Sequence, residues 1–257
     1  RPAAGGPRTR RGAAARRAGD GNGPSAGAGR LVIPGVAVLF AFLLASAAAG
    51  RWEQVLLYLN AEPFGVQAPI FGRDIAFYVF YLPVYRFVQG WLAAALFIAL
   101  IGLLVIYLAP NWGEMQRGAW RPRGSAAMRR HMAVTGGFLL LILAAGYALD
   151  VFGLLYSTRG VAYGASYTDM TAGLWALRLQ IAFTILTALA LFYNALRPAP
   201  RLPLLLGGLW LVSAVFVGGL LPGILQRYVV EPNELTLETP YIENNIALTR
   251  LAFALDR

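Results

Sequence analysis

Residues 60–87 read NAEPFGVQAPIFGRDIAFYVFYLPVYRF and interrupt a chain that is otherwise dominated by long apolar runs. Three prolines fall in this stretch, and prolines at such a spacing break a long helix. The charged pair Arg73 and Asp74 lies among Phe and Tyr side chains, a mixture typical of the membrane–water boundary. The stretch therefore predicts an interfacial segment between two membrane spans, with a short amphipathic helix over residues 75–81.

The composition predicts a membrane protein. Hydrophobic residues make up 58% of the chain, charged residues 13%, and the mean hydropathy is +0.58. Soluble domains usually contain about 25% charged residues. The net charge of +10 comes from arginine alone, and the arginines lie between the apolar runs. Their expected partners are therefore the anionic headgroups of membrane lipids at the Arg-rich cytoplasmic segments, and not nucleic acid.

Five apolar runs each have about the 20 residues that a helix needs to cross a bilayer. They cover residues 31–50, 88–109, 132–151, 174–196 and 202–225. The predicted fold is an all-α transmembrane bundle of five spans, with interfacial amphipathic helices on its outer side. Residues 1–30 hold mostly Ala, Gly, Pro and Arg and have little to bury, so they are predicted to be disordered, either as a solvated linker or as a basic arm on anionic lipid.

The distribution of arginine predicts the orientation in the membrane. With residue 1 on the cytoplasmic side, fourteen arginines fall in inside segments and seven in outside segments, with Arg178 left near a span end. Short cytoplasmic loops retain positive charge. The prediction is a bacterial cell-membrane protein with a cytoplasmic N-terminus and an extracytoplasmic C-terminus, in which residues 227–257 start the external region.

Two helix starts are predicted near the outer side. Thr168 and Asp169 are suited to cap the fourth span. Thr239 is suited to cap a C-terminal helix that has Pro240 at its first position. One face of that helix is an apolar stripe without a partner in the sequence, formed by Ile242, Ile246, Thr249 and Phe253.

Familiar catalytic motifs are absent from the sequence. It contains no GxxxxGK phosphate loop and no GxSxG serine motif. There is no Cys, and the single His131 has no second His or acidic pair beside it that would complete a metal site. No enzyme activity, cofactor or metal is therefore predicted.

Charged residues near the predicted span ends form the candidate site. A lone charge deep in hydrocarbon costs roughly 2.5–3.5 kcal/mol, so Asp150 and Arg178 are expected to pair. One hypothesis is an outward-facing polar cleft; the alternative is that these side chains reach water and fix loops to the helix ends. The candidate cluster consists of Arg73, Asp74, Asp150, Arg159, Asp169 and Arg178.

Three stretches carry a family resemblance. They read WEQVLLYLNAEPFGVQAPIFGRDIAFYVFYLPVYRF, GYALDVFGLLYSTRGVAYGASYTD and QRYVVEPNELTLETPYIENNIALTR. In this order they resemble Uncharacterised Protein Family 0182, large bacterial multi-pass membrane proteins. The resemblance implies about seven spans followed by a long external domain, so that this chain would hold the later spans and the start of that domain. It implies no catalytic or binding residue.

These features leave three functional hypotheses. The first is the membrane anchor and scaffold of a large extracytoplasmic domain in the bacterial envelope. The second is a transporter or channel subunit that admits a solute through the polar cleft. The third is an enzyme acting on lipid or cell-wall precursors.

Overall fold

The computed structural model describes residues 24–109, 126–160 and 162–255, with side chains from residue 34 onward. Within these ranges the chain is helical and forms no strand, and one isolated bridge joins Gln67 to Asp74. Four helices are long and apolar enough to cross a membrane. A fifth is counted when Pro34–Ala49 and Trp52–Leu59 are taken together as one broken span. The predicted all-α, multi-span fold is confirmed.

The chain divides into two compact units, residues 1–47 and 48–257. The first unit holds nearly all of α1 (Pro24–Ala49), which has Pro34 in its interior. Residues 1–30 are predicted to be disordered. Residues 1–23 lie outside the described part of the chain, and residues 24–30 belong to α1. The second unit holds all the other elements.

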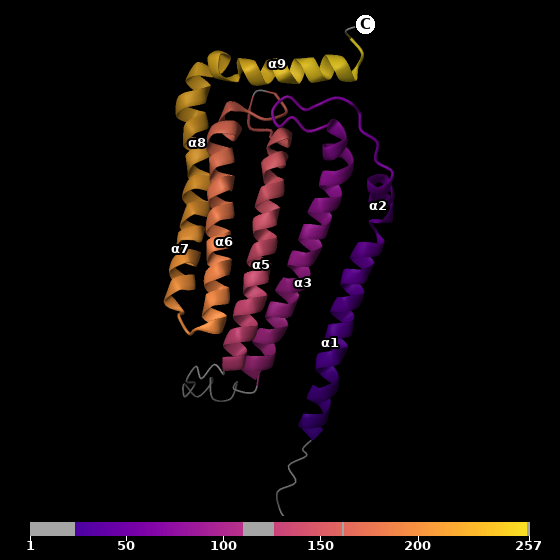
Figure 1. Ribbon diagram of the computed structural model, residues 1–257, viewed down its shortest axis with the longest axis vertical. Coiled ribbons are helices and arrows are strands. Elements are labelled where there is room, and N and C mark those ends of the chain that lie inside the picture. The colour runs from indigo at the N-terminus through magenta and orange to yellow at the C-terminus, as the bar shows by residue number, and fades with distance from the viewer. Residues whose placement is uncertain (1–23, 110–125, 161, 256–257) are drawn as a thin grey trace, which may run out of the picture. The chain divides into compact units, whose positions relative to one another are not determined.

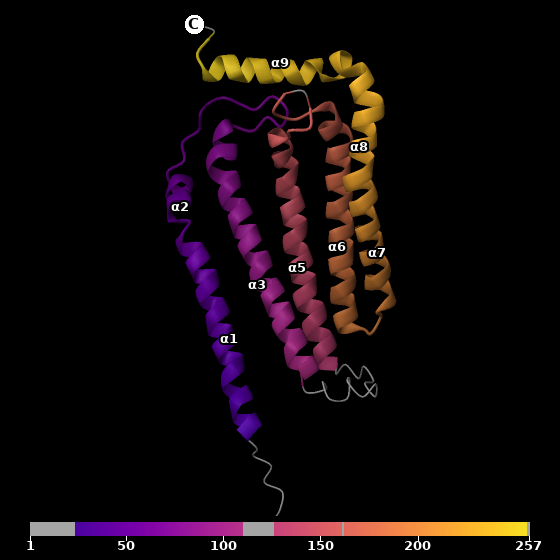
Figure 2. The ribbon, with the colours of Figure 1, turned by 180° about the vertical axis from the view of Figure 1, so that it is seen from behind.

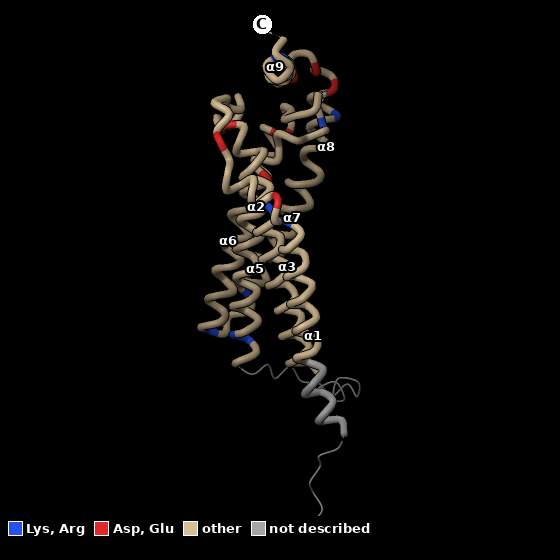
Figure 3. Tube along the Cα trace, turned by 90° about the vertical axis from the view of Figure 1, so that its right-hand side faces the viewer, with Lys and Arg blue, Asp and Glu red and all other residues tan. Residues whose placement is uncertain are grey.

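Four long helices of the second unit lie side by side in chain order (Figures 1 and 2). They are α3 (Leu82–Leu108), α5 (Ala126–Gly153), α6 (Leu174–Leu196) and α7 (Arg201–Val215). Acidic residues gather toward the end of this bundle that carries the C-terminal helix, whereas basic residues also mark the opposite end (Figure 3). We call the end that carries the C-terminal helix the α9 end.

The contact between α5 and α6 depends on glycine. A Cβ added to Gly137 would lie 2.7 Å from the ring of Phe192, and one added to Gly136 would lie 3.4 Å from Leu191. Small residues at helix contacts in membranes let two backbones approach closely. Gly137 therefore sets the spacing of the two central helices.

Three prolines of this unit do not break the helical run in which they lie, because a π-helical turn precedes each of them. The π segments are η1 (Phe77–Tyr81), η5 (Phe216–Leu220) and η6 (Gln226–Val230), and the prolines are Pro83, Pro222 and Pro232. In each case the amide of the residue before the proline bonds to the carbonyl five residues back. The wider turn makes room where proline lacks an N–H and its ring crowds the preceding turn. The separate amphipathic helix predicted over residues 75–81 is therefore wrong, since these residues lead directly into α3.

The helix that starts at Arg201 continues through α8 (Leu221–Leu225), η6 and η7 (Glu231–Asn233) into α9 (Glu234–Ala252). There the chain bends, and α9 runs crosswise over the ends of the bundle helices (Figures 1 and 3). The predicted start at Thr239 and Pro240 is wrong, because Pro240 lies inside α9. The Thr239 hydroxyl donates to the carbonyl of Leu235 one turn earlier and does not cap.

The packed face of α9 differs from the predicted apolar stripe. Ile246, Thr249 and Phe253 are exposed, and of the stripe only Ile242 is half-buried. The face that contacts the bundle is partly polar, and it consists of Glu238, Tyr241, Ile242, Asn245 and Leu248. Two loops of the α9 end receive it. One is residues 60–74 after α2 (Trp52–Leu59), and the other is residues 162–165, which follow η3 (Leu154–Tyr156) in the chain.

Candidate functional site

Three of the six predicted site residues line one cavity at the α9 end. Asp150, Arg159 and Asp169 border a hollow of about 570 Å³ between α3, α5, α6 and the helix that follows α7. Arg86 of α3 joins them there. We call this hollow the charged cavity. Arg73, Asp74 and Arg178 do not line it.

Asp150 pairs with Arg86 and not with Arg178, so the predicted Asp150–Arg178 pair is wrong. Arg86 Nη2 lies 3.2 Å from Asp150 Oδ1 and donates to the carbonyl of Leu149 at 3.4 Å. The Arg178 guanidinium instead lies 5.2 Å from the ring centre of Trp175, three residues earlier on the exposed side of α6. Residues three apart are neighbours on a helix, and a guanidinium is attracted to the face of an indole ring.

Asp169 is held by three groups and is almost completely buried, with 1% of its surface exposed. Arg159 Nη1 donates to Asp169 Oδ1 at 2.9 Å. The hydroxyl and the amide of Ser166 donate to Oδ2 at 2.8 and 3.2 Å. The Asp169 amide in turn donates to Ser166 Oγ at 3.2 Å. This reciprocal pair is a capping box, in which Ser166 is the N-cap. The prediction of Thr168 and Asp169 as N-cap is therefore displaced by two to three residues.

Asp74 and Arg73 fix a loop to the helix ends, as the alternative hypothesis for the cluster expects. The amides of Phe64, Gly65 and Ala76 donate to the Asp74 carboxylate at 3.0, 2.9 and 2.8 Å. The bond from Ala76 is the main reason why the pKa of this carboxyl lies below its ordinary value; burial opposes it and the other two amides add to it. The Arg73 guanidinium lies 5.3 Å from the ring centre of Phe77.

The charged cavity reaches inward to Gln180 on α6. Gln180 Nε2 donates to Ser213 Oγ at 2.9 Å, and that hydroxyl donates to the carbonyl of Trp210. Gln180 Oε1 is buried and has no hydrogen-bond partner within the described residues. Beyond it, Thr184 and Thr187 are buried and donate to carbonyls of their own helix. A buried polar stripe thus follows α6 inward from the cavity.

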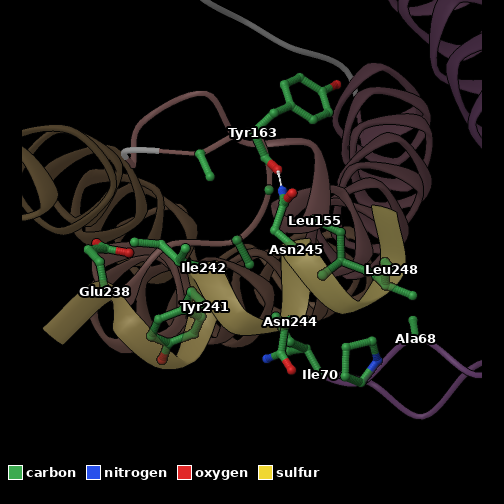
Figure 4. Close-up of a pocket in the computed structure, with 14 residues that line it drawn as sticks. Ala68, Ile70, Leu155, Tyr163, Glu238, Tyr241, Ile242, Asn244, Asn245 and Leu248 are labelled. Atoms are coloured by element: carbon green, nitrogen blue, oxygen red, sulfur yellow. Dashed lines mark hydrogen bonds between the residues drawn. The ribbon is translucent and has the colours of Figure 1, made fainter. Parts of the chain in front are cut away.

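A second, smaller hollow of about 120 Å³ lies under α9, and we call it the α9 seat (Figure 4). Glu238 is only 2% exposed. The amide of Tyr167 donates to both of its carboxylate oxygens, at 3.2 and 3.3 Å. Asn245 Nδ2 donates to the carbonyl of Tyr163. The α9 seat therefore attaches the C-terminal helix at two points.

Sequence reasoning missed Arg86, Ser166 and Glu238. Ser166 and Asp169 have the spacing of a capping box, so that signal was present. The predicted span started at residue 88, whereas α3 starts before Pro83 and includes Arg86. A span extended through Pro83 would have placed Arg86 among the charges near span ends. Glu238 had no sequence signal, because its partner is a backbone amide. Among the described residues, no group of three or more His, Asp or Glu side chains could hold a metal ion.

Comparison with known proteins gives a consistent result. Residues 18–257 match the profile described as "Uncharacterised protein family (UPF0182)". The chain is 40% identical over 227 residues to a UPF0182 protein of Frankia alni, covering 88% of this chain and 22% of that protein. It is 40% identical over 217 residues to one of Thermobifida fusca, covering 84% and 21%. No solved structure matches.

Proposed function

Since this chain belongs to the UPF0182 family and spans about a fifth of the length of the curated relatives it matches, we propose that it is the membrane anchor and scaffold of a larger bacterial envelope protein. The bundle crosses the cell membrane with residue 1 in the cytoplasm, and α9 starts the extracytoplasmic part. The scaffold fixes the direction in which that part leaves the membrane.

The observation that carries this proposal is the attachment of α9. The last membrane helix leads into α9 through the 3-10 turn η7 and a bend at Asn233, with no loop between them, so the two are directly connected. Glu238 and Asn245 then hold α9 at two points seven residues apart, which is about 10 Å along a helix. Two attachments fix a direction, whereas one would leave the helix free to swing.

Burial gives the first attachment its strength. A buried carboxylate is unfavourable unless it is hydrogen-bonded, and here the Tyr167 amide provides that bond. The surrounding fit is close, because a Cβ at Gly160 would lie 2.8 Å from Ser166 Cβ and 3.5 Å from Glu238 Oε2. Moving Glu238 out would leave the Tyr167 amide without its partner.

Spin labels test the fixed orientation, since the chain has no cysteine of its own. In the full-length protein in nanodiscs, labels at Thr158→Cys and Glu243→Cys should give one narrow distance distribution. Adding Glu238→Ala and Asn245→Ala should broaden it. A broad distribution without those two changes would contradict the proposal.

A cellular comparison tests the role itself. Cells whose full-length copy carries Glu238→Ala with Asn245→Ala should behave like cells that lack the protein. Gln180→Leu, which alters the buried polar stripe of α6 and neither attachment of α9, should leave the cells normal. The reverse outcome would favour transport over scaffolding.

Transport is the second candidate, and one observation favours it. The charged cavity is continued along α6 by buried polar residues, Gln180, Thr184 and Thr187. A polar stripe facing the interior of a bundle is typical of a solute or ion path. Ion flux from proteoliposomes that is lost in Gln180→Leu but kept in Glu238→Ala would support this candidate.

A further inference from the structure

We propose that the charged cavity binds the phosphate headgroup of an anionic phospholipid. Arg86 and Arg159 would hold the phosphate, and the acyl chains would leave along η5. This site is separate from the α9 seat and does not depend on the scaffold role proposed above.

The two guanidinium groups have donors to spare. Arg86 uses Nη2 for Asp150 and Leu149, and Arg159 uses Nη1 for Asp169. An arginine side chain has five N–H donors, and the remaining ones on both residues have no partner within the described residues. The Arg86 side chain is 44% exposed and that of Arg159 is 41% exposed. Guanidinium groups match the geometry of phosphate oxygens.

The two carboxylates of the cavity differ in their effect on an anion. Asp169 is enclosed by Arg159 and Ser166, so Asp169 and Arg159 largely offset each other's charge, while Arg159 keeps N–H donors that Asp169 does not use. The Asp150 side chain is 48% exposed and shares Arg86 with any bound phosphate. Asp150 should therefore weaken the binding of an anion and strengthen the binding of a cation.

The rest of the wall is suited to a lipid rather than to free phosphate. Apart from Tyr147, Ser157 and Gln180, it is formed by small and apolar residues that include Leu177, Ala214, Gly218 and Gly219. Gly218 is exposed, and a Cβ added there would meet nothing within 4 Å. Beside it the exposed residues are apolar, among them Phe216 and Leu220. A cavity of about 570 Å³ that opens beside apolar helix surface accommodates a headgroup and the start of its chains.

Binding of phosphatidic acid, phosphatidylcholine and inorganic phosphate to the purified chain in detergent tests the proposal, with native mass spectrometry and thermal unfolding as readouts. Phosphatidic acid should bind at least about tenfold more tightly than phosphatidylcholine, and inorganic phosphate should not displace it at equal concentration. Arg86→Gln with Asp150→Asn should weaken the binding of phosphatidic acid about tenfold or more, the effect of losing hydrogen bonds to a charged group.

Two further variants separate the possible ligands. Asp150→Asn alone should tighten the binding of phosphatidic acid. Gly218→Leu should fill the mouth of the cavity and abolish lipid binding, whereas the matched change Gly208→Leu should have no effect, because Gly208 is equally exposed and does not line the cavity. Unfolding without lipid, compared for the two leucine variants, shows that both are folded.

Three results would overturn the proposal. Weaker binding in Asp150→Asn would mean that the ligand is cationic. Binding of inorganic phosphate that matches that of the lipid and is unaffected by Gly218→Leu would mean that the site takes free phosphate. Equal binding of phosphatidic acid and phosphatidylcholine would mean that the headgroup is not recognised.

Discussion

Replacing Ser166 with alanine should loosen the start of the helix that continues as α6. Ser166 is 1% exposed, and its hydroxyl both accepts from the Asp169 amide and donates to Asp169 Oδ2. Loss of an N-cap costs about 1 kcal/mol, and loss of a hydrogen bond to a charged group costs about 1.5–3 kcal/mol. Since the two losses share one hydroxyl, we expect a total of about 2–3 kcal/mol.

Hydrogen exchange measures this change where it occurs. A loss of about 2 kcal/mol in the free energy of local opening corresponds to exchange that is about 30-fold faster. The affected amides should be those of η4 (Asp169–Gly173), the first turns of the helix. Amides near Gly137, in the centre of α5, should exchange as in the unchanged protein.

Thr171→Ala is the matched control for this prediction. Thr171 lies five residues further on in the same helix, is half-buried, and donates only to the carbonyl of Tyr167. Such a bond within the helix contributes little, so its loss should accelerate exchange less than about fivefold. If Ser166→Ala had no larger effect than Thr171→Ala, the capping box would not stabilise this helix start.

Three other predictions follow from the packing and the charges. Gly137→Ala should lower the free energy of unfolding in detergent by about 1–3 kcal/mol, because the added Cβ would lie 2.7 Å from the Phe192 ring. Gly208→Ala, whose Cβ would meet nothing within 4 Å, should be neutral or stabilising. Equal effects of the two changes would refute the close approach of α5 and α6. The lowered pKa of Asp74 means that its carboxylate stabilises the loop above the ordinary pKa of about 4, and that this contribution is lost as the pH falls through the lowered value. Acidification through this range should therefore lower the protection of the Phe64 and Gly65 amides, measured as their exchange rates relative to the intrinsic rates at the same pH, and an equal response in Asp74→Asn would contradict this origin. Glu238→Ala should release α9 and expose it to proteolysis. Glu238→Gln keeps an acceptor for the Tyr167 amide, so α9 should stay protected in that variant. Identical cleavage of the two variants would rule out this hydrogen bond as the attachment.

Hydropathy was sufficient to predict the fold class, since it depends only on the length and polarity of each run. The helix boundaries were harder, and proline explains why. Pro83 was expected to end a helix, but the π-helical segment before it removes the conflict. The choice between a break and a wider turn depends on packing around the proline, which the local sequence does not contain.

The candidate site, too, could be predicted only in part. One hypothesis placed Asp150, Arg159 and Asp169 around a cleft, because charges near span ends are restricted in depth and depth follows from position in the apolar run. Which charges meet depends also on how each helix is rotated. Arg178 is close enough to the α9 end to be a candidate, but its position on α6 directs it to Trp175 on the exposed side.

The rotation of α9 about its own axis also explains why polar residues hold it. An apolar stripe was the only visible reason for its helix to pack, yet Ile246 and Phe253 are exposed. Beneath α9, the carbonyl of Tyr163 in a loop and the amide of Tyr167 at the first turn of the following helix need a side-chain donor and a side-chain acceptor. Glu238 and Asn245 are seven residues apart, so they share one face of the helix. The attachment of α9 is therefore decided by backbone groups more than seventy residues earlier in the chain, which no local pattern in α9 reveals.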